Sequence, residues 1–129
     1  MADRSQHWFA QARRDLDFAV QSARTGFHEW ACFIAHQAAK KALKALHLRS
    51  GQEAWGHLPA RLLRELPAPI DVPGELAERA RVLDGYYIPP RYPDSYPEGA
   101  PYQHYGPRQS QEAIAHARAI LEFVRTQMA

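Results

Sequence analysis

The chain has 129 residues, a net charge of +2 at pH 7 and one cysteine. This length predicts one domain over residues 1–129, whose core needs no disulfide or metal for support. So small a net charge does not by itself indicate nucleic-acid binding. No apolar run approaches the roughly 18 residues of a membrane span. The N-terminal stretch is charged and unlike a signal peptide, so we expect a soluble, cytoplasmic protein without a membrane partner.

Apolar residues recur at three- and four-residue steps along most of the chain, which predicts helices. Nothing alternates with period two over four or more residues, so no sheet is expected. We expect helices from about Asp3 to Arg24, from about Phe27 to Arg49, from about Leu58 to Leu66, from near Pro73 to Pro89-Pro90, and from about Pro107 to Met128.

The predicted fold class is all-α, an antiparallel four-helix up-and-down bundle with an additional short helix and a long Tyr/Pro-rich loop before the last helix. The second helix is apolar over a wider arc than one partner helix would cover, so we expect it to be central and expect a homodimer. Cys32 is expected to be a small buried hydrophobe, and Leu58 and Tyr87 to point inward from their helices. The predicted core comprises Trp30, Phe33, Ile34, Leu43, Leu83, Ile114, Leu121 and Val124.

The segment YYIPPRYPDSYPEGAPYQHYGP, residues 86–107, holds all six tyrosines and six of the ten prolines. A loop this long is usually functional or disordered, and its aromatic content argues against disorder, so we expect it to be ordered by its own rings. Arg91, with Tyr87, Tyr92 and Asp94 around it, has two interpretations. It locks the loop by stacking on tyrosine and pairing with a carboxylate, or it offers its planar fork to a phosphate while the rings stack on a base.

The second helix carries the basic run HQAAKKALKALHLR. His36, Lys40 and Lys44 share one face at i, i+4 and i+8, and Gln37, Lys41 and Lys44 form the adjacent row. This surface is either a solvated face whose cations complement the helix dipole or a binding site for phosphate or a partner's acidic groups. His57 opens the short helix and is expected either to cap it or to face the end of the basic helix.

Several chemical classes lack their usual signatures. The seven histidines and one cysteine show no metal-ligand spacing. There is no Gly-rich phosphate loop and no serine in a nucleophile elbow. We therefore expect no metal and no cofactor.

Two stretches suggest a family. FHEWACFIAHQAAKKALKALHLRSG, followed by His57 and a Leu-rich short helix, and then LDGYYIPPRYPDSYPEGAPYQHYGPRQSQEAIAHARAILEFV, together resemble the HEPN domain over nearly the whole chain. The resemblance implies a bundle of four or five helices that is often dimeric and associates with nucleotide or RNA. In many members it implies a toxin role beside a small nucleotidyltransferase-type antitoxin. Lys40 stands where relatives commonly have Glu.

Ribonuclease members of that family carry an arginine and a histidine in the pattern R-x(4–6)-H. No arginine of this chain has a histidine at that spacing. The resemblance therefore implies no catalytic residues here, and Arg91 with His104 is the only pair we consider for an unusual arrangement.

Our first hypothesis is a non-catalytic module that binds nucleotide or RNA phosphate and acts with a nucleotidyltransferase-type partner in a toxin–antitoxin-like system. The loop would bring Arg91 towards Lys44 and His57 at the end of the second helix, and Arg91, Lys41 and Lys44 would form one anion pocket. The alternatives are a divergent ribonuclease using Arg91 and His104, and a ligand-free structural oligomerisation domain. The expected ligand-binding residues are Gln37, Lys41, Lys44, His57, Tyr87, Arg91, Tyr92 and Asp94.

Overall fold

A computed structural model describes residues 3–129, and every regular element in that range is helical. The α-helices are α1 (Ser5–Arg24), α2 (His28–Arg49), α3 (Pro59–Arg64), α4 (Gly74–Asp84) and α5 (Pro107–Met128). Two short 3₁₀ helices, η1 (Pro93–Ser95) and η2 (Pro101–His104), lie in the Tyr/Pro-rich loop. None of the helices in this range is long and apolar enough to cross a membrane. The predicted all-α class is confirmed.

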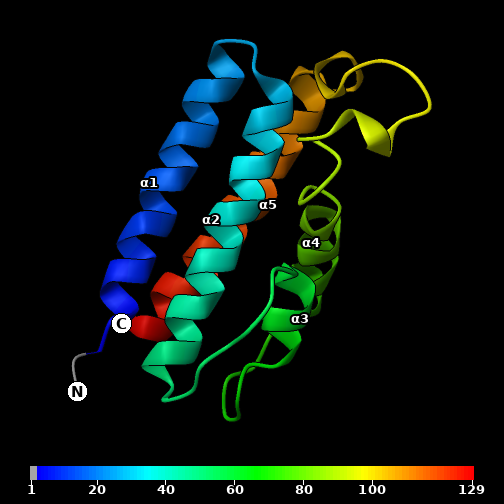
Figure 1. The fold of residues 1–129 in the computed structure, drawn as a ribbon. Helices are drawn as coiled ribbons and strands as arrows, with labels where there is room; N and C mark the ends of the chain where they lie inside the picture. The colour runs from blue at the N-terminus through cyan, green and yellow to red at the C-terminus, as the bar shows by residue number, and fades with distance from the viewer. Residues whose placement is uncertain (1–2) are drawn as a thin grey trace.

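Helix α2 lies at the centre of the bundle (Figure 1). It packs most extensively against α1 and α5, and also contacts α3, α4 and η2. The four main helices alternate in direction along the chain, so α1 and α4 run one way and α2 and α5 the other (Figure 1). The loop before α5 therefore lies at the end of the bundle where α1 turns into α2. This is the predicted up-and-down bundle.

Small side chains explain how α2 can touch so many neighbours. Six of its alanines are fully buried, and together they point in several directions around the helix axis: Ala31, Ala35, Ala38, Ala39, Ala42 and Ala45. Alanine favours helix and lets adjacent backbones approach closely. Leu43 and Leu46 fill the remaining space in the same helix. The wide apolar arc of α2 is thus accounted for within one chain.

Five members of the predicted core are buried, namely Leu43, Leu83, Ile114, Leu121 and Val124, and Cys32 is buried as expected. Three members are not. Trp30 is 43% exposed, and Phe33 and Ile34 are only half-buried. The reason is that alanines occupy the places where helices meet α2, so the large rings of its first turns lie at the rim. Trp30 contacts Phe33 edge-on there, with ring centroids 6.1 Å apart.

Two helices, α3 and α4, have ends that differ from the predictions in ways that matter for the site. Helix α4 ends at Asp84 rather than at Pro89-Pro90, because Gly85 is a poor helix former and the chain turns there, with Tyr86 N–H donating to the Leu83 carbonyl. Tyr87 is therefore a loop residue. Helix α3 is shorter than predicted at both ends, and Leu58, which precedes it, is 45% exposed rather than inward.

The Tyr/Pro-rich loop is held by its own rings, as expected. The Tyr96 hydroxyl donates to the Tyr105 hydroxyl at 2.6 Å, and Tyr105 is buried against the core. His104 stacks on Tyr96 with ring centroids 4.1 Å apart, and its Nε2 donates to the Glu98 carbonyl at 2.8 Å. Gly99, at φ +81°, makes the turn between these contacts. The loop therefore gives Arg91 a defined position.

Two leucines provide a matched test of this packing. Leu43→Ala removes a fully buried side chain from the centre of α2 and should lower the free energy of unfolding by about 2–5 kcal/mol. Leu58→Ala changes a side chain that is 45% exposed and should cost less than about 1 kcal/mol. Chemical denaturation of both variants measures the difference, and equal losses would contradict the central position of α2.

Candidate functional site

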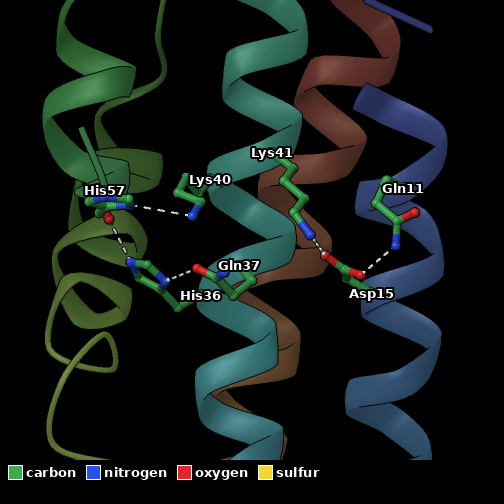
Figure 2. Close-up of polar contacts among 7 residues, drawn as sticks. All are labelled: Gln11, Asp15, His36, Gln37, Lys40, Lys41 and His57. Atoms are coloured by element: carbon green, nitrogen blue, oxygen red, sulfur yellow. Dashed lines mark hydrogen bonds and ion pairs between the residues drawn. The ribbon is translucent and has the colours of Figure 1, made fainter. Parts of the chain in front are cut away.

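One stripe of α2 carries buried polar residues. His36 and His47 are 0% and 1% exposed, and Lys40, which lies between them, is 8% exposed. Lys40 follows His36 by four residues and His47 follows Lys40 by seven, so the three share one helix face. This face points at the segment that leads into α3 and at α3 itself. Figure 2 shows His36 and Lys40 on that side of α2, with His57 opposite them.

The two histidines fasten this segment to α2. His36 Nε2 donates to the His57 carbonyl at 2.6 Å, and His47 Nε2 donates to the Leu62 carbonyl at 2.8 Å. The pKa of His36 is lowered to about 4, chiefly because burial disfavours its charged form. The neutral ring carries its one proton on Nε2. Its Nδ1 lies 3.2 Å from the side-chain Oε1 of Gln37.

Lys40 is a buried cation without a carboxylate partner. Its Nζ lies 3.4 Å from Nδ1 of His57. None of the ion pairs within residues 3–129 includes Lys40. The pKa of Lys40 is lowered to about 8, chiefly by burial and also by the charges of Lys44, Lys41 and Arg91, while Asp15 acts in the opposite direction. This lysine therefore exists as a mixture of ammonium and free amine near neutral pH.

His57 and Tyr87 stack against each other, with ring centroids 4.7 Å apart and planes 11° apart. The extended segment before α3 runs back along α2 (Figure 1), so His57 faces the middle of that helix and not its end. Burial against its neighbours and the charges of Lys40, Lys44 and Arg91 hold the pKa of His57 below its usual range. The ring of His36 also contacts Tyr87, at 5.2 Å. The ring of Tyr87 is thus enclosed by its neighbours.

Arg91 lies among aromatic rings. Its guanidinium carbon is 4.4 Å from the ring centroid of Phe33, 4.7 Å from that of Tyr87 and 5.2 Å from that of Tyr92. Its Nε donates to the Tyr87 carbonyl at 2.7 Å. The stacking interpretation is therefore correct for the rings, but Arg91 has no carboxylate partner among residues 3–129, Asp94 included. The terminal guanidinium nitrogens remain available to a ligand.

We expected Arg91, Lys41 and Lys44 to meet in one pocket, but the three side chains contact different residues. Because α4 runs antiparallel to α2, its C-terminal end delivers Arg91 to Phe33 in the first half of α2, not to the basic end. Lys41 turns the other way and pairs with Asp15 of α1 at 2.6 Å (Figure 2). Lys44 Nζ lies 5.9 Å from the ring centroid of Trp8, also on α1.

The remaining predicted residues divide as follows. His57, Tyr87 and Arg91 come together with Lys40, whereas Gln37 is held by His36. Tyr92 and Asp94 are exposed beside Arg91 along the chain. His104 is engaged with Tyr96 and Glu98, and no hydrogen bond joins it to Arg91 in the described residues. The same range holds no group of three His, Cys, Asp or Glu side chains suited to a metal ion.

Sequence reasoning missed Lys40 and Phe33 as members of the site. The shared face of His36 and Lys40 was visible in the spacing, but both interpretations of it, a solvated face or a binding site, placed it at the surface, whereas both residues are buried. A further signal was His47, eleven residues after His36 and hence on the same stripe. Buried histidines at both ends of a stripe indicate that something packs along it, and Lys40 lies between them. Phe33 offered no such signal beyond its apolar character.

The buried His36 makes stability depend on pH. The unfolded chain protonates His36 near its ordinary pKa of 6.5, and the folded chain only near about 4. The free energy of unfolding should therefore fall as pH drops from 6.5 to 4, by up to about 1.4 kcal/mol per pH unit. His36→Gln should reduce this slope, and His7→Gln, at an exposed histidine, should leave it unchanged. Urea unfolding at stepped pH measures it, and equal slopes in all three proteins would refute the assignment.

Comparisons with known proteins place this geometry in a family. A model of the HEPN domain matches residues 5–127. The crystal structure of TT1696 from Thermus thermophilus is 48% identical, with a TM-score of 0.96, over 98% of this chain and 99% of that one. ST0689, described as an archaeal HEPN homologue, is 39% identical, with a TM-score of 0.84, over 99% and 100%.

A third solved structure, the HEPN domain protein TM0613 from Thermotoga maritima, is 33% identical, with a TM-score of 0.75, over 93% of this chain and 95% of that one. No protein with a curated description matches the chain. The family match covers almost all of the chain, and the solved relatives share its fold from end to end. The chain therefore belongs to the HEPN domain family.

Proposed function

We propose that this chain is a non-catalytic HEPN module of the cytoplasm that binds the phosphate groups of a nucleotide or RNA. The observation that carries the proposal is the grouping of Lys40, His57 and Arg91 without an acidic partner. His57 and Arg91 lie against the ring of Tyr87, Lys40 Nζ lies 3.4 Å from His57 Nδ1, and none of the three belongs to an ion pair within residues 3–129. An anion would offset the charges of Lys40 and Arg91, which act on each other.

The nearest carboxylate does not compete for this role. Asp15 is bound to Lys41 at 2.6 Å and accepts from Gln11 Nε2 at 2.8 Å. It lies across α2 from His57, as Figure 2 shows. Lys41 and Lys44 add positive potential from that side without contacting Arg91, since the charges of both act on Lys40. A phosphate at Arg91 and Lys40 would therefore meet more positive than negative charge, since Lys44, Lys41 and Arg91 oppose Asp15 alone at Lys40.

The aromatic residues support a nucleotide rather than bare phosphate. The half-buried ring of Tyr87 is already in contact with His57, His36 and Arg91. Tyr92 is 49% exposed and touches only the guanidinium of Arg91 among the described aromatic and cation–ring contacts. Stacking of a base on an exposed tyrosine contributes about 1–3 kcal/mol. We assign the base to Tyr92 and the phosphate to Arg91 and Lys40.

The proposal includes protein partners. The family resemblance supports a nucleotidyltransferase-type partner in a toxin–antitoxin-like system, and a homodimer. The wide apolar arc of α2 no longer supports the dimer, because other helices of the same chain cover it. What remains for a protein contact is the exposed group of Phe18, Phe27 and Trp30 where α1 turns into α2.

Arg91→Lys tests the binding site. Lysine keeps the charge but loses the planar fork and the ring stacking. A charge-assisted contact contributes about 1.5–3 kcal/mol, so the Kd for ATP or a short RNA should rise roughly 10- to 100-fold. Arg108→Lys is the matched control, because Arg108 is exposed on α5 away from these rings. Isothermal titration measures both variants, and wild-type binding should also weaken steeply with added salt if several phosphates are contacted.

The rival interpretation makes Arg91 only a clamp for the loop. It predicts that Arg91→Lys lowers the melting temperature and leaves the affinity for ATP and RNA unchanged. Melting curves recorded beside the titrations separate the two interpretations. Unchanged affinity with a lowered melting temperature would overturn the proposed site.

Cleavage of RNA is not expected from this chain. General acid–base cleavage needs two groups within reach of one ribose phosphate, and His104 is instead stacked on Tyr96 and bonded to the Glu98 carbonyl. Purified protein should leave a labelled RNA intact at the rate of a buffer control. Robust cleavage that His104→Ala abolishes would establish the ribonuclease alternative.

A further inference from the structure

All three lysines of the chain lie within five residues of α2, and each has a different environment. Lys41 is paired with Asp15. Lys44 lies against the ring of Trp8. Lys40 is the most buried of the three, and its amine lies beside an imidazole nitrogen instead of a carboxylate. This difference has chemical consequences, because only an unprotonated amine is a nucleophile.

The surroundings of Lys40 combine a proton acceptor with an anion site. His57 Nδ1, 3.4 Å from Nζ, can take a proton from the amine, and the ring of His57 is exposed, which gives a reagent a route to Nζ. The ring of His57 stacks on the ring of Tyr87, and the guanidinium of Arg91 also lies against the ring of Tyr87. Arg91 is also close enough to Lys40 for its charge to act on that amine, so a molecule with its phosphate at Arg91 can reach Lys40 with its far end.

We propose that Lys40 is a reactive amine that condenses reversibly with a phosphate-bearing aldehyde held by Arg91; with such a ligand the phosphate lies at Arg91 alone, and the amine of Lys40 meets the aldehyde instead of the phosphate. The inference rests on the proposed phosphate-binding function and adds a covalent step to the same site. The residue involved is a lysine where the family resemblance leads one to expect glutamate. The proposed step is neither RNA cleavage nor nucleotide binding.

The step balances without an oxidant or reductant. The lone pair of Nζ attacks the aldehyde carbon, and the carbonyl electron pair moves to oxygen. A proton passes from nitrogen to that oxygen, with His57 Nδ1 as the nearest carrier. The resulting carbinolamine loses water and forms the C=N bond of an imine. Hydrolysis reverses the reaction.

The electrostatics favour this lysine over the other two. Burial lowers the pKa of Lys40 to about 8, with Lys44, Lys41 and Arg91 acting in the same direction. Each unit by which an amine's pKa falls gives about tenfold more free amine at neutral pH. Burial also lowers the pKa of Lys44, but that lysine lacks the neighbouring imidazole acceptor. Lys41 forms an ion pair with the carboxylate of Asp15 instead.

Labelling with pyridoxal 5′-phosphate, followed by sodium borohydride, tests the inference on the intact protein. Borohydride adds hydride to the imine carbon and fixes the adduct as a secondary amine. Peptide mass spectrometry then compares the three lysines within one sample. We expect Lys40 to be labelled at least about tenfold more than Lys41 or Lys44, and inorganic pyrophosphate to suppress the labelling.

Two comparisons make the test specific. Pyridoxal has no phosphate, and it labels every lysine less because much of it is an internal hemiacetal, so the ratio of Lys40 to Lys41 labelling is compared. That ratio should be at least about fivefold lower with pyridoxal than with its phosphate ester, because the charge-assisted contacts are missing. Lys40→Arg should lose the adduct, and Lys44→Arg should keep it. Since Lys41 and Lys44 are internal references in the wild-type protein, the result does not depend on any variant folding.

The outcomes separate this inference from the proposed function. Equal labelling of the three lysines, with ATP binding that still depends on Arg91, would overturn the reactive amine and leave the phosphate site standing. A ratio of Lys40 to Lys41 labelling that is as high with pyridoxal, with no competition by pyrophosphate, would overturn the phosphate-directed step and count against the phosphate site itself. Selective labelling that pyrophosphate suppresses supports both.

Discussion

The structure depends on the close approach of other helices to α2. Fully buried alanines occupy its contacts with the neighbouring helices, and a helix enclosed in this way has little surface left for solvent. Polar side chains on it are therefore buried and need partners inside the protein. His36 and His47 find theirs in the carbonyls of His57 and Leu62, and these two bonds fix the segment before and within α3 along the helix.

That arrangement leaves Lys40 in an unfavourable environment. It lies between two satisfied histidines, in a place where an ammonium group loses much of its hydration, and burial of a charge is unfavourable unless it is paired. Its nearest polar neighbour is His57, which is itself held below its usual pKa by the surrounding cations. The packing of α2 thus creates a local shortage of negative charge. The Tyr/Pro-rich loop adds to this shortage by bringing Arg91 to the same side of the helix.

Periodicity was sufficient to predict the helices, their order and the bundle, because each helix must bury one face. It was not sufficient for the site, because it assigns residues to a helix face without saying what covers that face. Lys40 and Lys41 are adjacent in sequence and point to opposite sides of α2, one to His57 and the other to Asp15 (Figure 2). The position of Arg91 depends on where α4 ends. Because of Gly85, the helix ends several residues earlier than the sequence predicted. Trp30 was assigned to the core from its place in the apolar stripe of the second helix, whereas alanines are the residues buried where other helices meet α2.

The identity of residue 40 decides the sign of the charge at this site. A glutamate there, as the family resemblance leads one to expect, would lie among Lys41, Lys44, Arg91 and His57 and would neutralise part of their charge. Lysine reverses that contribution, from −1 to +1 at full ionisation. With glutamate, the cations around Tyr87 would have an internal partner, and the site would be a structural ion network. With lysine, no residue described in the structure can supply that partner, so the missing negative charge has to come from solvent or from a ligand.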